Sequence, residues 1–190
     1  MIDFTGVKAI TIPEGKVKKI VRKSDGVQIW AGVNNVIASS INPDGTPYRG
    51  VNGEIGYKSN YKINSALNEA TANGCYLTGY IPAAPKDVFY LPKGLYPYDT
   101  SEGDRSVVLY DANFTVLKRC QTKAWYPLRN NSQLISEGLS FHDDGSGATF
   151  TPYCLRYWLS LATVNQTAYV RFVTRKMDAN TVITKNEPID

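Results

Sequence analysis

The 190-residue chain is poor in the residues on which most metal and redox sites depend. It has one histidine, His142, and three cysteines, Cys75, Cys120 and Cys154, which are far apart and include no Cys-x-x-Cys pair. Zinc sites and thiol–disulfide centres use closely spaced cysteines and histidines, so the sequence indicates neither. We expect the three cysteines to be buried thiols, and we predict no cofactor and no metal ion.

The chain also lacks a long hydrophobic run, since none approaches the ~20 residues that a membrane-spanning helix needs. Residues 1–8 lack the basic start and the apolar stretch of a secretory signal. We therefore expect synthesis in the cytoplasm and no membrane span. The net charge of +4 is small and does not by itself indicate a nucleic-acid partner.

What the chain does have is a succession of short segments rich in strand-forming residues and separated by turns. The best pattern is Thr167–Val173, where Val170 and Phe172 would face one side of a sheet and Arg171 the other. One short helix is expected, from Ser65 to Ala72, ended by Asn73-Gly74. The other expected strands are Tyr57–Ile63, Cys75–Ile81, Asp87–Leu91, Ser106–Tyr110, Val116–Cys120, Leu134–Ile135, Thr149–Thr151, Tyr157–Leu161 and Thr181–Thr184. This pattern predicts an all-β fold, a β-sandwich.

The N-terminal segment is expected to form a separate β-hairpin arm. Residues 17–23 and 27–30 flank Ser24-Asp25-Gly26, and Asp-Gly is a strong signal for a hairpin turn. The first of these segments has a helical spacing of apolar residues but is too short for a stable helix. We therefore expect a strand with a bulge.

Three units follow from this organisation. Residues 1–32 would be the hairpin anchor, and residues 56–190 would hold the β-sandwich domain. Residues 33–55 are rich in Asn, Pro, Gly and Ser, which rarely build a packed element, so we predict a linker arm.

Five positive charges lie close together in residues 16–23. They could contact phosphates, but they do not alternate with the aromatic residues that single-strand binders use. A solvated hairpin edge that docks on an acidic protein neighbour is favoured, with no nucleic acid as partner. The candidate anchoring residues are Lys18, Lys19, Arg22 and Trp30.

Aromatic residues are abundant, with 13 Tyr and three Trp. An aromatic ring in an exposed loop can stack on the C–H face of a sugar and offers a large contact area at low entropic cost. The alternative is that these residues belong to the core or to a subunit interface. The candidate ligand-binding residues are Tyr96, Tyr98, Trp125 and Tyr126.

Catalytic signals are weak. A single histidine leaves little choice for a catalytic triad, and Gly145-Ser146-Gly147 is one residue short of a nucleophile elbow. The acidic loops at Asp99–Asp104 and Asp143-Asp144 could offer oxygen ligands to Ca²⁺, but they lack the spacing of an EF-hand loop, and plain turns are favoured. We predict that the chain is not an enzyme. A pair of glycosidase carboxylates would meet only in space, so that alternative stays open.

The order of several segments resembles the β-sandwich modules of structural proteins of tailed bacteriophages and prophages, including tail, baseplate, fibre and head-decoration components. The hairpin segments Ile12-Pro13-Glu14-Gly15 and Val27-Gln28-Ile29-Trp30 are similar to a hairpin of such proteins. The chain departs from the family pattern at Lys86-Asp87, where Gly-Asp is usual, and in a long insert, Leu91 to Arg105. The domain segments that carry the resemblance are Gly56-Tyr57-Lys58, Tyr61-Lys62-Ile63-Asn64-Ser65, Thr78-Gly79-Tyr80-Ile81-Pro82, Lys86-Asp87-Val88, Leu109-Tyr110-Asp111, Tyr169-Val170-Arg171-Phe172 and Ile183-Thr184-Lys185-Asn186-Glu187-Pro188-Ile189.

The resemblance implies a jelly-roll-like β-sandwich and a virion structural protein that works in an assembly with other virion proteins. Isolated edge strands and a marginal hairpin also favour a homo-oligomer. Residues 1–55 would anchor the protein, and residues 56–190 would project and contact a glycan or protein of the host surface. One alternative is a capsid decoration protein or head fibre, and another is an enzyme that degrades surface polysaccharide. Placement on the tail or on the head stays open.

Overall fold

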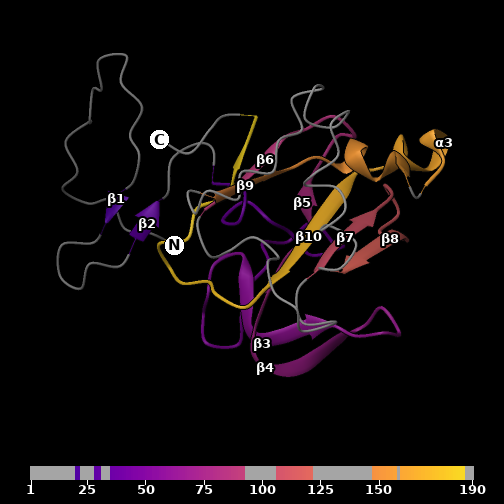
Figure 1. Cartoon of the computed structure of the whole chain (residues 1–190). Coiled ribbons are helices and arrows are strands. Elements are labelled where there is room, and N and C mark those ends of the chain that lie inside the picture. Colours follow the sequence, from indigo (N-terminus) through magenta and orange to yellow (C-terminus); the bar gives the residue numbers. More distant parts are fainter. Residues whose placement is uncertain are drawn as a thin grey trace, which may run out of the picture.

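The computed structural model describes residues 20–21, 28–30, 35–92, 106–121, 147–157 and 159–186. In these parts of the chain the strands form antiparallel sheets, and the helices are a 3-10 helix, η1 (Pro152–Tyr157), and a single α-helical turn, α3 (Leu161–Val164). The fold is therefore all-β, as predicted (Figure 1). None of the helices in these parts is long and apolar enough to cross a membrane.

The N-terminal hairpin consists of β1 (Ile20–Val21) and β2 (Gln28–Trp30), which pair antiparallel. The register shifts between Ile20 and Val21, in agreement with the predicted strand with a bulge. In Figure 1 the hairpin lies to one side of the two larger sheets.

Two larger sheets form the body of the fold. The first has the strand order β3 (Tyr57–Ile63), β4 (Glu69–Thr78), β10 (Tyr169–Thr174), β7 (Ser106–Tyr110) and β8 (Val116–Gln121), and β5 (Ile81–Pro82) also pairs with β10. The second has the order β11 (Thr184–Lys185), β6 (Phe89–Pro92) and β9 (Gly147–Phe150).

The inner face of the larger sheet packs against the smaller sheet. Val170 and Phe172 of β10 are buried in the same cluster as Phe89 of β6 and Phe150 of β9. The centroid of the Phe172 ring lies 5.6 Å from that of Phe89 and 6.0 Å from that of Phe150. The predicted alternation in β10 is confirmed, and the two sheets form a sandwich.

The outer face of the larger sheet is also buried, because the β3–β4 ribbon bends across it. Between the pairs Ser59–Tyr76 and Tyr61–Thr71, β3 contains only residue 60 whereas β4 contains residues 72–75. This large bulge bends the two strands together. Beyond the bend, the ribbon covers a second cluster formed by Ile63, Cys75, Leu77, Val108, Tyr110 and Val173.

The predicted helix over Ser65–Ala72 is wrong. Residues 64–68 form the hairpin turn between β3 and β4, in which Asn64 Oδ1 accepts a hydrogen bond from the Asn68 amide over 3.0 Å. Glu69 then starts β4, so Asn73-Gly74 is not a helix stop. Gly74 has a φ of +69° and lies in the bulge, where its N–H donates to Asn60 Oδ1.

Two other expectations need correction. Tyr157–Leu161 is not a strand, because η1 extends to Tyr157 and Ser160 Oγ caps the start of α3 by accepting from the Thr163 amide. The predicted linker, as far as the structure describes it in residues 35–55, is packed rather than loose. The buried residues there are Val36, Ile37 and Tyr48. The Ile41 amide donates to the main-chain oxygen of Tyr80 over 3.0 Å.

Four hairpin turns share one hydrogen-bond pattern. In each, the amide of the first residue donates to the oxygen of the fifth, and the amide of the fourth donates to the oxygen of the first. The fourth residue has a positive φ, which suits Gly45 and Gly53 but is unusual for Leu67 (64°) and Phe114 (60°). The four turns are 42–46, 50–54, 64–68 and 111–115.

Candidate functional site

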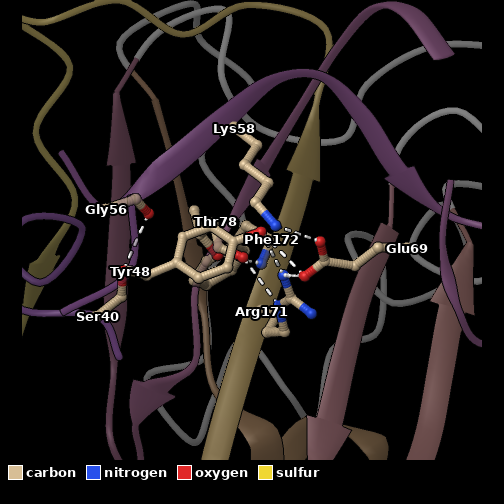
Figure 2. A network of polar contacts seen from close by, with 8 residues as sticks. All are labelled: Ser40, Tyr48, Gly56, Lys58, Glu69, Thr78, Arg171 and Phe172. Atoms are coloured by element: carbon tan, nitrogen blue, oxygen red, sulfur yellow. Dashed lines mark hydrogen bonds and ion pairs between the residues drawn. The ribbon is translucent and has the colours of Figure 1, made fainter. Parts of the chain in front are cut away.

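A buried arginine lies on the outer face of the larger sheet. Arg171, in the middle of β10, is only 1 % exposed. Its Nη2 donates to Glu69 Oε1 over 2.7 Å and to the Tyr48 hydroxyl over 3.0 Å (Figure 2). Lys58 Nζ lies 2.7 Å from the other carboxylate oxygen of Glu69. We call Tyr48, Lys58, Glu69 and Arg171 the ionic clasp.

A gap in the ladder of β10 explains the place of Arg171. β4 pairs with β10 as far as Val173, and β5 resumes the pairing at Val170. Thr78 fills this gap, because its main-chain oxygen accepts from Arg171 Nε over 2.8 Å and its hydroxyl accepts from the Phe172 amide over 2.9 Å. The side chain of Arg171 thus replaces a missing strand-to-strand hydrogen bond.

Aromatic rings enclose the two cations of the clasp. The guanidinium carbon of Arg171 lies 4.5 Å from the ring centroid of Tyr80 and 5.2 Å from that of Tyr48. Lys58 Nζ lies 4.9 Å from the Tyr48 centroid. Cation–π contacts of this kind add to the ion pairs when the cation is shielded from water.

Tyr48 is brought to the clasp by tight main-chain packing. The Gly56 amide donates to the main-chain oxygen of Tyr48 over 3.0 Å, and Ser40 Oγ donates to the main-chain oxygen of Gly56 over 2.9 Å. Gly56 has a φ of +81°, and a Cβ at this position would overlap the main-chain oxygen of Ile37. Only glycine therefore fits here.

The electrostatics of the clasp keep Glu69 ionised and Tyr48 protonated near neutral pH. Burial alone would raise the pKa of Glu69, but the Arg171 charge and the hydrogen bonds from Lys58 and Arg171 outweigh it and lower the pKa below 4.5. Burial raises the pKa of Tyr48 well above its ordinary value. A general acid or base works best with a pKa near the operating pH, so this arrangement suits a structural role rather than proton transfer.

A second cluster, of aromatic residues, adjoins the clasp through Tyr80. The Tyr80 ring meets Tyr110 and Phe114 edge-to-face, with centroid distances of 4.8 and 4.9 Å, and Phe114 stacks on Tyr169 at 4.5 Å. Burial raises the pKa of Tyr110 to about 12, so the hydroxyl stays protonated. These rings pack on one another, and Phe114 makes its ring contacts from a backbone with a positive φ of 60°.

Most of the residues that the sequence singled out lie outside the described residues. This holds for the acidic loops 99–104 and 143–144 and for most of the anchoring and ligand-binding candidates, and only the backbone of Trp30 is described. Their roles therefore stay predictions. The candidates outside the described residues are Lys18, Lys19, Arg22, Tyr96, Tyr98, Trp125 and Tyr126.

The clasp itself was not predicted as a site. Its signal in the sequence is Arg171, a charged residue at the centre of the strongest apolar alternation in the chain. Nothing in the sequence points from Arg171 to Glu69, which is 102 residues away. Of the cysteines, Cys75 and Cys154 are buried as expected. Within the described residues, no group of three or more His, Cys, Asp or Glu side chains is placed to hold a metal ion.

Comparison with known proteins gives no match: no family model fits the chain, and no curated protein or solved structure is significantly similar to it.

Proposed function

We propose that the chain is a structural protein of a tailed-bacteriophage particle, anchored by its N-terminal arm and projecting the β-sandwich. The observation that carries this proposal is the coincidence of the phage-like segments with the strands of the fold. Segments 56–58 and 61–65 lie largely in β3, segment 78–82 ends β4 and includes β5, and segment 169–172 lies in β10. Much of the resemblance therefore falls on strands, although segment 86–88 lies in a turn.

The chemistry of the clasp supports a structural role. Its carboxylate, Glu69, accepts hydrogen bonds from Tyr48, Lys58 and Arg171, and these side chains come from separate parts of the chain. These hydrogen bonds and ion pairs join the 35–56 segment, the β3–β4 ribbon and β10. A protein that projects from a particle needs such ties between its segments more than it needs a reactive group.

The N-terminal hairpin supports the anchoring part of the proposal. A two-stranded hairpin is marginally stable in water by itself and gains stability when it docks on a larger surface. Residues 16–23 carry five positive charges, and β1 lies within this stretch. β2 follows it in the sequence. We propose an acidic surface of a neighbouring virion protein as the docking partner, and a homo-oligomer as the assembled form.

The segments that follow β6 and β8 in the sequence carry the proposed contact with the host. Tyr96 and Tyr98 belong to the first of these segments and Trp125 and Tyr126 to the second. Aromatic side chains of this kind suit a glycan or protein of the host surface. The proposed localisation is the virion, after synthesis in the host cytoplasm.

The proposal can be tested on phage particles from the host culture that produces this chain. Gradient-purified particles would be analysed by peptide mass spectrometry and labelled with gold-coupled antibody against residues 56–190. We expect peptides of the chain in the particle and gold at a defined place on it. Gold at the tail tip would support host contact, whereas gold over the head would favour a decoration protein. Particles without peptides or gold would refute the virion role.

A further inference from the structure

The part of the β3–β4 ribbon beyond its bend forms a separate layer over the outer face of the larger sheet. Glu69 places the start of β4 above β10, where it meets Arg171. At the tip of the ribbon, the main-chain oxygen of Asn64 accepts a hydrogen bond from Arg119 Nη1 of β8 over 3.0 Å. Figure 1 shows β3 and β4 crossing the direction of β10. We call residues 60–74 the strap.

The strap is joined to the rest of the sheet by a bend that already departs from regular pairing. Asn60 and Gly74 both have positive φ values, 61° and 69°, and face each other through the hydrogen bond from the Gly74 amide to Asn60 Oδ1. The regular pairs Tyr57–Thr78 to Ser59–Tyr76 lie on the side of the body. Movement at the bend would therefore leave the pairing of β3 and β4 near the body intact.

One carboxylate provides the ion pairs that hold the strap down. Glu69 joins the strap both to Arg171 and to Lys58, each over 2.7 Å. Without the Glu69 charge, Arg171 would be a nearly fully buried cation without its anionic partner. Removing one partner of a buried ion pair is strongly unfavourable, whereas opening the strap would let water reach Arg171.

We propose that the strap is a latch-held flap: it opens about the Asn60–Gly74 bend when Glu69 loses its charge, while the two sheets beneath it stay folded. Opening would expose the apolar outer face, which includes Val108, Tyr110 and Val173. The sandwich core lies on the opposite face of the same sheet, and its buried cluster contains no residue of the strap.

The charges around Glu69 set the direction of the pH response. The neighbouring cations and hydrogen-bond donors hold its pKa below 4.5, so the latch is fully closed above that pH and is lost as the pH falls through the lower, folded-state pKa. Burial raises the pKa of Tyr48 and Tyr110, and both stay neutral over this range. The titratable and charged groups that face Glu69 or the strap from the neighbouring elements are Tyr48, Lys58, Tyr110, Arg119, Arg171 and Arg175.

Hydrogen exchange of the full-length protein, read by peptide mass spectrometry and corrected for intrinsic rates, tests this proposal. The strap is followed in residues 61–71, and the core in residues 107–109 and 170–172. Glu69→Gln removes the charge and keeps the shape of the side chain. Asp87→Asn is the matched control, because Asp87 also pairs with a lysine, Lys185, and accepts a hydrogen bond from Asn186, but lies beside the smaller sheet and away from the strap.

We expect Glu69→Gln to increase exchange in the strap by about thirtyfold at neutral pH, with the core unchanged, whereas the strap of Asp87→Asn should exchange like that of the wild type. In the wild type, acidification below pH 4.5 should release the strap before the core. The same wild-type pH series decides the matter if Glu69→Gln does not fold. Strap and core amides that lose protection together in that series, or equal effects of the two substitutions, would overturn the proposal.

Discussion

Replacement of Arg171 by methionine tests the weight of the ionic clasp in the stability of the fold. Methionine fills the space of the aliphatic part of the arginine side chain, but it cannot replace the hydrogen bonds that Arg171 donates to the main-chain oxygen of Thr78, the Tyr48 hydroxyl and Glu69. Hydrogen bonds of charged groups contribute about 1.5–3 kcal/mol each, and burial of the apolar methionine regains about 1.5–3 kcal/mol. We expect a net loss of about 3–6 kcal/mol in the free energy of unfolding, because three hydrogen bonds are lost.

Urea unfolding followed by circular dichroism measures this loss. Arg175→Met is the matched control, because Arg175 follows the same strand and donates from Nη1 to the Asn73 oxygen, but is half-buried. We expect the control to cost less than about 1 kcal/mol, as for most partly exposed contacts. Equal costs for Arg171→Met and Arg175→Met would refute the reasoning that burial and the clasp make Arg171 special.

Three further predictions concern other parts of the fold. Gly56→Ala should prevent accumulation of folded protein, because the added Cβ would overlap the main-chain oxygen of Ile37. Gly45→Ala has nothing within 4 Å of the added Cβ and should lower the free energy of unfolding by only about 1 kcal/mol, because of its positive φ. Expression level and thermal unfolding distinguish the two variants. Phe114→Ala should lower the free energy of unfolding in urea by about 2 kcal/mol, because the stack on Tyr169 is lost. Phe114→Gly should lower it by less, because glycine also adopts a φ of 60° without strain. A larger loss for the glycine variant would contradict this explanation. Burial alone would raise the pKa of Asp87, but the Ala84 amide and the side chains of Asn186 and Lys185 lower it below 3.8, so its contribution is present above that pH and is lost in more acidic solution. Asp87→Asn should therefore cost about 1 kcal/mol at pH 7 and nothing in strong acid, and a difference that does not change with pH would count against it.

The sequence predicted those parts of the fold in which local pattern and tertiary packing agree. Tyr57–Ile63 and Ser106–Tyr110 are strands with the predicted bounds. The alternation of residues 167–173 gave the inner and outer faces of β10 correctly, because side chains of a strand point to opposite sides in turn. The jelly-roll arrangement stays a prediction.

The failures have a common physical cause, which is that long-range contacts override local preference. Ser65–Ala72 has residues that tolerate a helix, but the turn at 64–68 and the pairing with β3 are more favourable in the fold. The polar stretch 33–55 looked like a linker because only a few apolar residues, among them Ile37 and Tyr48, supply its packing. Turn residues predict where the chain reverses, and they do not tell whether the segment between the turns is buried.

The clasp could be predicted only in part. Arg171 stands out as a cation within an apolar strand, and such a residue requires partners when it is buried. The partners come from β4 and from the 35–56 segment, and their approach depends on the bend of the ribbon at Asn60 and Gly74. A bend of this kind has no strong local signature, because asparagine and glycine are also common in ordinary turns.

A double-mutant cycle with Glu69→Gln and Arg171→Met tests most directly whether the ionic clasp joins the strap to the sheet. The free energy of unfolding would be measured in urea for the wild type, both single variants and the double variant. Because the two side chains are in contact over 2.7 Å and Arg171 is buried, we predict a coupling energy of about 1.5–3 kcal/mol. Additive effects, with a coupling below about 0.5 kcal/mol, would contradict the account.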